Sequence, residues 1–216
     1  MTAHVNVLPK AHHLREGLMT LDLWNTFATF GTFLVIAATA IVAMVQLRHI
    51  RCSNQIAAMN DLRETAESEE LRAARQFVFT ELGEKMKDLD FRYQVWNRAA
   101  RTSESQAFIT KISTVGNFWE GVGTLVKAGL LDAELVFEVW SGHLIDDWEK
   151  LAPVTALSRR GVGSVIMENF EYLTVLAQDW DASHPNGTYP QRMRRINLKD
   201  DWLEADTKYA ASLAMA

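Results

Sequence analysis

Residues 23–47 read LWNTFATFGTFLVIAATAIVAMVQL, which is 25 consecutive positions without a charged side chain. A helix of this length reaches about 37 Å at 1.5 Å per residue, and the hydrocarbon core of a bilayer is about 30 Å thick. Helix tilt or a position in the headgroup layer absorbs the surplus. The stretch therefore predicts one membrane-spanning helix close to the amino terminus.

The charges that flank this segment predict its orientation. Arg48, His49 and Arg51 follow it directly, whereas Lys10 and Arg15 precede it at a greater distance. Basic residues close to a span favour the cytoplasmic side, and acidic residues count little in this rule. We therefore expect the domain after residue 47 to face the cytoplasm.

Small and hydroxyl-bearing residues interrupt the apolar side chains of the span. A threonine hydroxyl is tolerated in lipid because it can donate to a carbonyl one turn earlier. Ala28 and Thr32, or Thr39 and Ala43, have the four-residue spacing that lets helices pack closely in a membrane. This spacing leaves self-association through the span open.

Two alternatives concern how the amino terminus is processed. Residues 38–40 read Ala-Thr-Ala, which resembles the cleavage site of a secretory signal peptide. The apolar run continues to Val45 and a basic cluster follows, which favours an uncleaved anchor. Residues 1–22 show no clear apolar face and are expected to be a tail, and a translation start at Met19 instead of Met1 is a further hypothesis.

Charge and cysteine content limit the functions of the rest of the chain. Only two of the 22 basic and two of the 27 acidic residues precede residue 48, so the net charge of −5 belongs to the part after the span. An acidic balance argues against nucleic acid as the main partner, because phosphate neutralisation supplies most of that affinity. Cys52 is the only cysteine, which excludes an internal disulfide and a cysteine zinc site.

Helical periodicity dominates after the span, and the fold class is predicted to be all-α. A stalk helix is expected to continue from the span, with Cys52, Ile56, Met59, Leu62 and Ala66 on one face. Four apolar stripes follow, and each is expected to be the buried face of one helix in an antiparallel bundle. They comprise Leu71, Ala74, Val78, Leu82 and Leu89; Phe108, Ile112, Val115, Trp119, Val122 and Val126; Phe137, Trp140, Leu144, Trp148 and Leu151; and Ile166, Phe170, Leu173, Ala177 and Trp180.

Capping and breaking residues predict where these helices begin and end. Ser68 and Asp132 are expected to cap helices, and Ser103 with Gln106 has the spacing of a capping box. Gly129 and Pro153 are expected to end helices, and a last helix is predicted over 198–213. The predicted organisation is a tail at 1–22, a transmembrane helix at 23–47, a juxtamembrane stalk at 48–67, a helical bundle at 68–180 and a turn-rich segment with a carboxyl-terminal helix at 181–216.

From residue 24 to residue 180 the order of these features resembles a bacterial family of uncharacterised proteins, a domain of unknown function with one amino-terminal span. The resemblance is carried by the anchor, by Arg159, and by ELRAAR at 70–75, FWE at 118–120, the segment 123–131, WEKLAP at 148–153 and NFEYL at 169–173. It implies a single-pass protein of the bacterial inner (plasma) membrane with a cytoplasmic α-helical domain. It implies no activity.

Four charged residues lie on or beside the apolar stripes of different predicted helices: Arg75, Glu120, Arg159 and Glu171, with Glu168 as an alternative to the last. They are candidates for a partly buried ionic cluster that fixes helix register. The competing hypothesis is an anion or ligand pocket around Arg75 and Arg159.

Two further groups of residues could carry chemistry. His143 and Asp147 are one turn apart, but this helix has no second histidine or glutamate at metal-ligand spacing, so an ordinary surface histidine is favoured. Arg192, Arg194, Arg195 and Lys199 form a basic cluster. It is expected to be solvated, with lipid headgroups, which Arg48 and Arg51 are also expected to contact, and nucleic acid as the alternatives.

These observations favour a membrane-tethered helical module that acts by binding or as a scaffold, with no catalytic residue, metal or cofactor expected. Membrane lipid and a protein partner or second copy are the expected partners, and nucleic acid is not. Two alternatives stay open: an enzyme with a site near Arg75, Glu120 and Arg159 or around His143, and an oligomeric effector that perturbs membranes.

Overall fold

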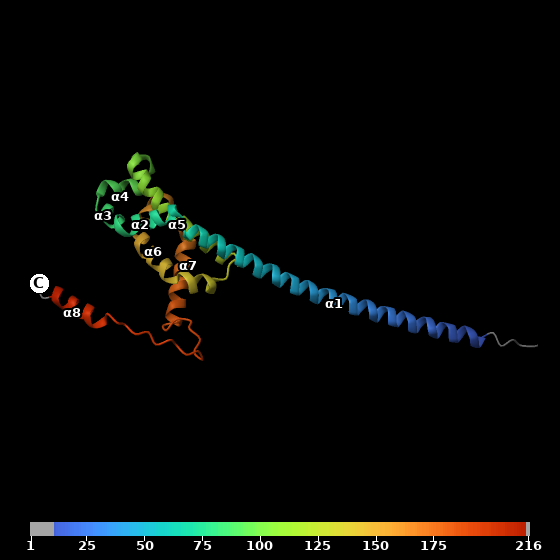
Figure 1. The fold of residues 1–216 in the computed structure, drawn as a ribbon. Coiled ribbons are helices and arrows are strands. Elements are labelled where there is room, and N and C mark those ends of the chain that lie inside the picture. Colours follow the sequence, from blue (N-terminus) through green and yellow to red (C-terminus); the bar gives the residue numbers. More distant parts are fainter. Residues whose placement is uncertain (1–10, 215–216) are drawn as a thin grey trace, which may run out of the picture.

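The computed structural model describes residues 11–214, and no strand occurs in that range, which confirms the all-α prediction. Figure 1 shows one long helix that projects from a compact group of shorter ones. The elements are α1 (Ala11–Ala66), α2 (Glu69–Thr80), α3 (Leu82–Lys85), α4 (Leu89–Trp96), the 3₁₀ turn η1 (Arg98–Ala100), α5 (Ser103–Lys127), α6 (Ala133–Val162), α7 (Glu168–Ser183) and α8 (Leu203–Ala214).

Helix α1 joins the predicted span and the predicted stalk without a break. It begins before the predicted boundary, because residues 11–22 are helical rather than tail. These residues contain no proline, and extending a helix that has already formed costs little. Residues 1–10, the remainder of the predicted tail, lie outside the described residues.

The span part of α1 has no protein neighbour to cover its apolar surface. Every large apolar side chain from Leu23 to Leu47 is more than half exposed. The hydroxyls of Thr29, Thr32 and Thr39 each donate to the carbonyl four residues earlier, at 2.7–2.8 Å, as the sequence predicts. Among the described elements, α1 is the one helix long and apolar enough to cross a membrane.

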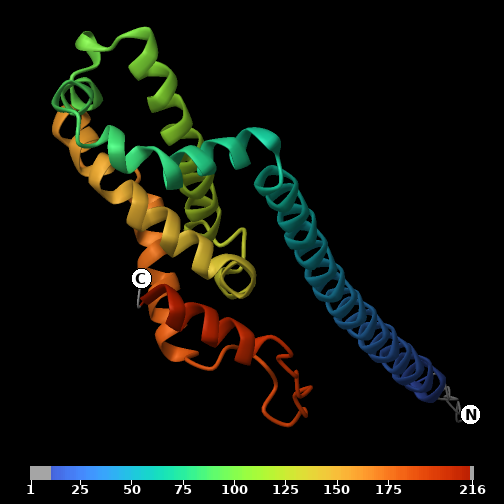
Figure 2. The same cartoon turned by 60° about the vertical axis from the view of Figure 1, so that its left-hand side comes forward.

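The anchor helix meets the bundle at a sharp elbow between α1 and α2 (Figure 2). Ser68 forms the predicted cap there, because its Oγ accepts a 3.2 Å hydrogen bond from the Leu71 amide. The last turns of α1 pack on the bundle through part-buried Met59, Leu62 and Ala66, whereas Cys52 and Ile56 of the same predicted stripe are exposed.

Helix α6 runs antiparallel to α5 and to α7, and α7 packs against both α5 and α6 (Figure 2). Helix α2 packs on α5, and α4 packs on α6. The predicted stripes supply most of the core, which contains Leu71, Ala74, Val78, Leu82, Ile112, Val115, Trp119, Val122, Phe137, Leu144, Leu151, Phe170, Leu173 and Ala177. Leu89 is an exception and is exposed, because the helix that carries Leu71 ends at Thr80 and Leu89 begins another.

Side-chain caps also mark the starts of α5 and α6. Asp132 caps α6 as predicted, by accepting a 2.9 Å hydrogen bond from the Glu134 amide. The capping box of α5 lies one residue before the predicted one, with Thr102 and Ser105 as the reciprocal pair instead of Ser103 and Gln106. Both pairs have the required spacing, and Ser105 is the residue that packs against the bundle, since it is 5 % exposed.

Helix ends follow the sequence less closely. Gly129 adopts φ +68° directly after α5, as expected for a glycine that ends a helix. Pro153 does not end α6, which continues to Val162. Proline removes one helical hydrogen bond, but Pro153 lies on the exposed face while Leu151, Val154 and Leu157 remain buried on the other side.

The carboxyl-terminal helix α8 begins at Leu203, five residues after the predicted start. The Asp200 carboxylate accepts a 3.0 Å hydrogen bond from the Trp202 amide, which fixes a turn before the helix. Residues 198–200 belong to no helix, and the large apolar side chains of α8 are exposed.

Candidate functional site

Asp147 of α6 is the only charged side chain with no exposed surface among the described residues. Its Oδ2 accepts a 2.7 Å hydrogen bond from the indole Nε1 of Trp119 in α5. The guanidinium Nε of Arg75 in α2 lies 3.0 Å from both carboxylate oxygens. One carboxylate therefore joins three helices of the bundle.

The local sequence explains why this carboxylate lies inside. Asp147 comes three residues after Leu144 and four before Leu151, which places it on the apolar face of α6. Trp119 occupies the matching position in α5, between the buried residues Val115 and Val122. A buried charge is tolerated only when hydrogen bonds and an opposite charge compensate for lost hydration, and Arg75 and Trp119 supply both.

Burial dominates the protonation equilibrium of this group. Removal from water raises the pKa of the Asp147 carboxyl above its ordinary value. The Trp119 hydrogen bond opposes that rise most strongly, followed by the charge and hydrogen bond of Arg75 and the charge of His143. The proton affinity of Asp147 therefore depends on side chains from all three helices.

A cavity of about 490 Å³ opens beside Asp147, under the elbow between α1 and α2. Its walls come from the end of α1 and from α2, α5 and α6. The lining residues are Ala66, Glu67, Leu71, Arg72, Arg75, Phe118, Trp119, Trp140, His143 and Asp147. This volume is typical of small-molecule sites, which are about 300–1,000 Å³.

The polar groups of this cavity differ in whether protein atoms already satisfy them. Both oxygens of Asp147 are engaged, and Glu67 accepts a 2.8 Å hydrogen bond from Arg63. The side chains of Arg72 and His143 have no hydrogen-bond or ion-pair partner among the described residues, and the hydrogen bond of Arg75 to Asp147 uses its Nε. The side chains of the cavity wall therefore offer more free donors than free acceptors, since the hydrogen bond from Arg63 leaves only Oε2 of Glu67 free.

The wall of the cavity contains the carboxylates of Glu67 and Asp147 and the imidazole of His143, and no serine, threonine, cysteine or lysine. The one buried carboxylate is held on both oxygens, so its role is to position Arg75 and Trp119. Within the described residues, no group of three or more His, Cys, Asp and Glu side chains could hold a metal ion.

The structure distributes the four charged residues predicted as one cluster over two places. Arg75 pairs with Asp147 at the cavity and not with Glu120, Arg159 or Glu171. The other three gather around the first turn of α7. There, Arg159 Nη2 lies 2.7 Å from Glu171 Oε2.

Glu120 and Arg159 hold the turn between α6 and α7. The residue before α7, Met167, has φ +56° and no side-chain cap. Glu120 Oε2 accepts hydrogen bonds from the amides of Asn169 and Phe170, at 3.1 and 2.9 Å, and so caps α7 from a distant helix. Arg159 Nε donates a 2.9 Å hydrogen bond to the Ile166 carbonyl.

Sequence reasoning named Asp147 only as a companion of His143 and did not identify Trp119 as its partner. His143 is exposed. A usable signal was present, because Asp147 has apolar spacing within the stripe of α6. A charge at such a position requires a buried donor on a facing helix.

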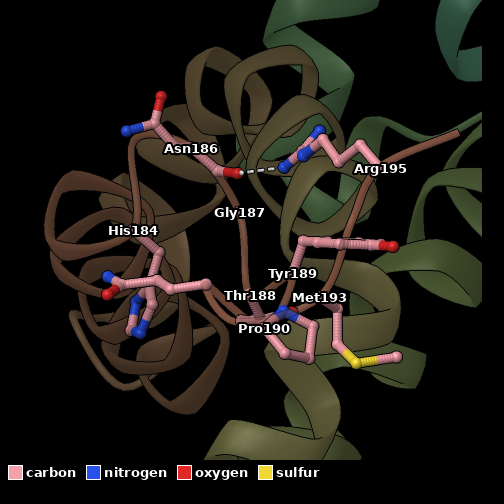
Figure 3. Close-up of a pocket in the computed structure, with 9 residues that line it drawn as sticks. His184, Asn186, Gly187, Thr188, Tyr189, Pro190, Met193 and Arg195 are labelled. Carbon is pink, nitrogen blue, oxygen red and sulfur yellow. Dashed lines mark hydrogen bonds between the residues drawn. The ribbon is translucent and has the colours of Figure 1, made fainter. Parts of the chain in front are cut away.

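A second cavity, of about 650 Å³, lies within the segment between α7 and α8 (Figure 3). Arg195 Nη2 donates a 3.2 Å hydrogen bond to the Asn186 carbonyl, and its guanidinium lies 4.7 Å from the centre of the Tyr189 ring. All lining residues come from residues 184–195 and are exposed. This cavity is a bend of one exposed segment, without a buried functional group.

The residues predicted to contact lipid lie in two regions. Arg48 and Arg51 are exposed on α1 directly after the apolar segment. Arg192 and Arg194 are exposed in the segment after α7, where Tyr189 donates a hydrogen bond to the Arg194 carbonyl at 3.0 Å. Arg195 is engaged in the local contacts described above.

The comparison with known families confirms the resemblance to a family of uncharacterised proteins. The family model described as "Domain of unknown function (DUF4760)" matches residues 33–180, from the middle of the apolar segment to the end of the bundle, and the chain belongs to this family. No curated protein and no solved structure matches the chain.

Proposed function

We propose that this protein is a single-pass membrane-tethered module whose helical bundle acts by binding in the bacterial cytoplasm, at the inner membrane. The observation that carries the proposal is the exposed, uncharged part of α1, which Arg48 and Arg51 follow directly. Exposed apolar surface of this extent is unfavourable in water and favourable in lipid. The basic residues then belong on the cytoplasmic side.

Tethering explains how such a module works without a catalytic centre. A bundle held at the membrane has a high local concentration relative to other membrane proteins, so weak contacts suffice. The stalk part of α1, from Leu47 to Ala66, is about 28 Å long, and the bundle packs on its last turns from Met59 onward. Exposed Arg48 and Arg51 add headgroup contacts of about 1 kcal/mol each.

Membrane anchoring is tested by carbonate extraction of the full chain. Wild type is expected in the pellet. Two arginines in the apolar segment, Ile36→Arg with Ile41→Arg, raise the insertion free energy by about 6–8 kcal/mol and move the chain to the supernatant. The control Ile56→Arg changes an exposed stalk residue and leaves the chain in the pellet. Wild type in the supernatant would contradict the proposal.

Orientation is tested with Cys52, which is exposed and is the only cysteine. It lies five residues after Leu47, so it reports the side of the membrane that the stalk occupies. A membrane-impermeant maleimide is expected to label it only after the cells are permeabilised. As a matched reporter for the other side, Lys10→Cys in a Cys52→Ser background is expected to react in intact spheroplasts.

The binding role is tested by crosslinking in cells that express the full chain. A discrete adduct with one other membrane-associated protein, absent from the Ile36→Arg and Ile41→Arg double variant, supports a scaffold role that depends on the anchor. Adducts with lipid alone would overturn it.

Self-association through the span is a second candidate. Thr32 donates its hydroxyl to the Ala28 carbonyl, so these two positions expose a small surface without an unpaired polar group. Replacing both residues by leucine is expected to abolish dimer crosslinking in membranes. The same double variant also abolishes toxicity on overproduction if the protein is an oligomeric membrane effector.

A further inference from the structure

We propose that the cavity under the elbow between α1 and α2 binds a small soluble organic monoanion with a flat apolar body. The acidic group interacts with Arg72 and the terminal nitrogens of Arg75, and the apolar body contacts Phe118 and Trp140. This site goes beyond the membrane-tethering role, and no residue of the apolar segment lines the cavity. Only the assignment of the ligand to the aqueous phase rests on the proposed membrane anchor.

The balance of donors and acceptors gives the sign of the ligand charge. The carboxylate acceptors in the wall are Asp147 and Glu67; both oxygens of Asp147 and Oε1 of Glu67 already accept hydrogen bonds from protein groups. The donors include Arg72 and His143, which have no such partner among the described residues. A ligand that supplies acceptors and negative charge fits this wall, because hydrogen bonds between guanidinium and anion are stronger than neutral ones.

The wall of the cavity also indicates that the ligand carries about one negative charge. Asp147 neutralises Arg75, and Arg63 neutralises Glu67, so Arg72 is the one arginine in the lining without an opposite charge beside it. The Arg75 guanidinium is held through its Nε, which fixes the direction of its two terminal nitrogens. Such a pair of arginines is suited to a single carboxylate or a singly charged phosphate ester.

The rest of the wall gives the shape of the ligand. Phe118 and Trp140 are part-buried aromatic side chains that line the cavity, and Leu71 adds an apolar surface at the side of α2. Aromatic faces favour contact with a flat ring. The volume of about 490 Å³ accommodates a bicyclic ring with one acidic substituent.

The distance of the cavity from the apolar segment favours a soluble ligand over a lipid headgroup. Ala66 and Glu67 line it at the end of α1, 19 and 20 residues after Leu47. A helix of that length extends about 28 Å, which is beyond the headgroup layer of the membrane in which the apolar segment lies. We therefore assign the ligand to the aqueous phase.

The test uses the full chain in detergent micelles and two matched probes, 2-naphthoate and the neutral 2-naphthamide. Isothermal titration is expected to give 2-naphthoate an affinity about 10-fold or more above that of the amide, because the amide lacks the charge-assisted hydrogen bonds. Arg72→Gln removes this preference, and Trp140→Leu weakens both probes.

The matched control is Arg160→Gln, which removes an exposed arginine of α6 outside the cavity and leaves both affinities unchanged. Arg72 is exposed and its removal leaves the fold intact, which circular dichroism of each variant verifies. No heat with 2-naphthoate at millimolar concentration, equal affinities for the two probes, or an unchanged preference in Arg72→Gln would each overturn the proposal. None of these outcomes alters the membrane fractionation, so the two proposals fail independently.

Discussion

The indole Nε1 of Trp119 donates a 2.7 Å hydrogen bond to Oδ2 of Asp147, a carboxylate with no exposed surface. Because Arg75 lies 3.0 Å from the same carboxylate, this group connects α2, α5 and α6 at the wall of the cavity. A bond network of this kind fixes the relative position of helices even where it adds little net stability. Asp147 therefore sets the shape of the cavity.

Asp147→Ala is expected to destabilise the bundle by about 3 kcal/mol, because it leaves Arg75 without its counter-ion and the Trp119 indole without an acceptor. Because 28 % of the Arg75 side-chain surface is exposed to solvent, we expect a loss of stability at the low end of the range for breaking a buried ion pair. Chemical denaturation of the full chain in detergent measures the effect. The control Asp146→Ala, at the exposed neighbouring residue, stays within about 0.5 kcal/mol of wild type; an equal loss in both variants would contradict the prediction.

The stability of the bundle is expected to depend on pH through the same carboxylate. Burial raises the pKa of Asp147 above its ordinary value near 3.8, which the unfolded chain retains. Between the two values the folded state binds more protons, so the free energy of unfolding falls as the pH rises. The contribution of Asp147 is complete below pH 3.8 and is lost as the pH passes through the raised pKa.

This pH dependence is measured as the difference in unfolding free energy between wild type and Asp147→Asn. The contributions of the other carboxyl groups are the same in both proteins and cancel in this difference. The asparagine variant cannot ionise, so wild type loses stability relative to it from about pH 4 upwards. If wild type instead gains stability relative to Asp147→Asn as the pH rises, Trp119 and Arg75 stabilise the charged carboxylate by more than its burial costs.

Local signals explain which parts of the fold the sequence predicts. The caps at Ser68 and Asp132 and the glycine at 129 act within a few residues of the helix end that they define. Pro153 is different, because the free-energy cost of a proline inside a helix competes with the burial of α6 residues before and after it in the sequence. Periodicity alone does not show which of these effects is larger.

The candidate site is predicted less completely, because its partners are distant in sequence. Arg159 and Glu171 are 12 residues apart, on either side of the loop between α6 and α7. The sequence predicts both as members of one ionic cluster. Arg75 and Asp147 are 72 residues apart, and a helical stripe gives the face of a residue without naming the residue opposite. The position of Asp147 on an apolar face indicated burial, but the identity of its partners required the structure.

Gly123 makes possible the close approach of α5 and α7. A Cβ atom at this position would overlap the backbone carbonyl of Asn169, which cannot move without shifting α7. Gly123→Ala is therefore expected to destabilise the bundle by about 1–3 kcal/mol, as overpacking does. Thermal unfolding of the full chain measures it.

The matched control lies two residues earlier in the same helix. A Cβ atom at Gly121 meets no atom within 4 Å, so Gly121→Ala is expected to stabilise α5 by about 0.5–1 kcal/mol through lower backbone entropy in the unfolded chain. The two substitutions are chemically identical and are expected to have opposite signs. The same sign in both would show that α5 and α7 are further apart than the contact at Asn169 implies.

Glu120→Gln is expected to loosen the first turn of α7 without changing the rest of the bundle. The carboxylate accepts hydrogen bonds from the Asn169 and Phe170 amides, and the helix has no cap of its own at Met167. Glutamine keeps the shape but loses the negative charge that a helix amino terminus favours, at a cost of about 0.5–2 kcal/mol. Hydrogen exchange of these two amides should rise accordingly, by about 2-fold to 30-fold, while the core amides of α5 and α6 stay unchanged. Glu149→Gln, at an exposed glutamate of α6, is the control and should leave every rate as in wild type; faster exchange there as well would assign the effect to net charge instead of to the cap.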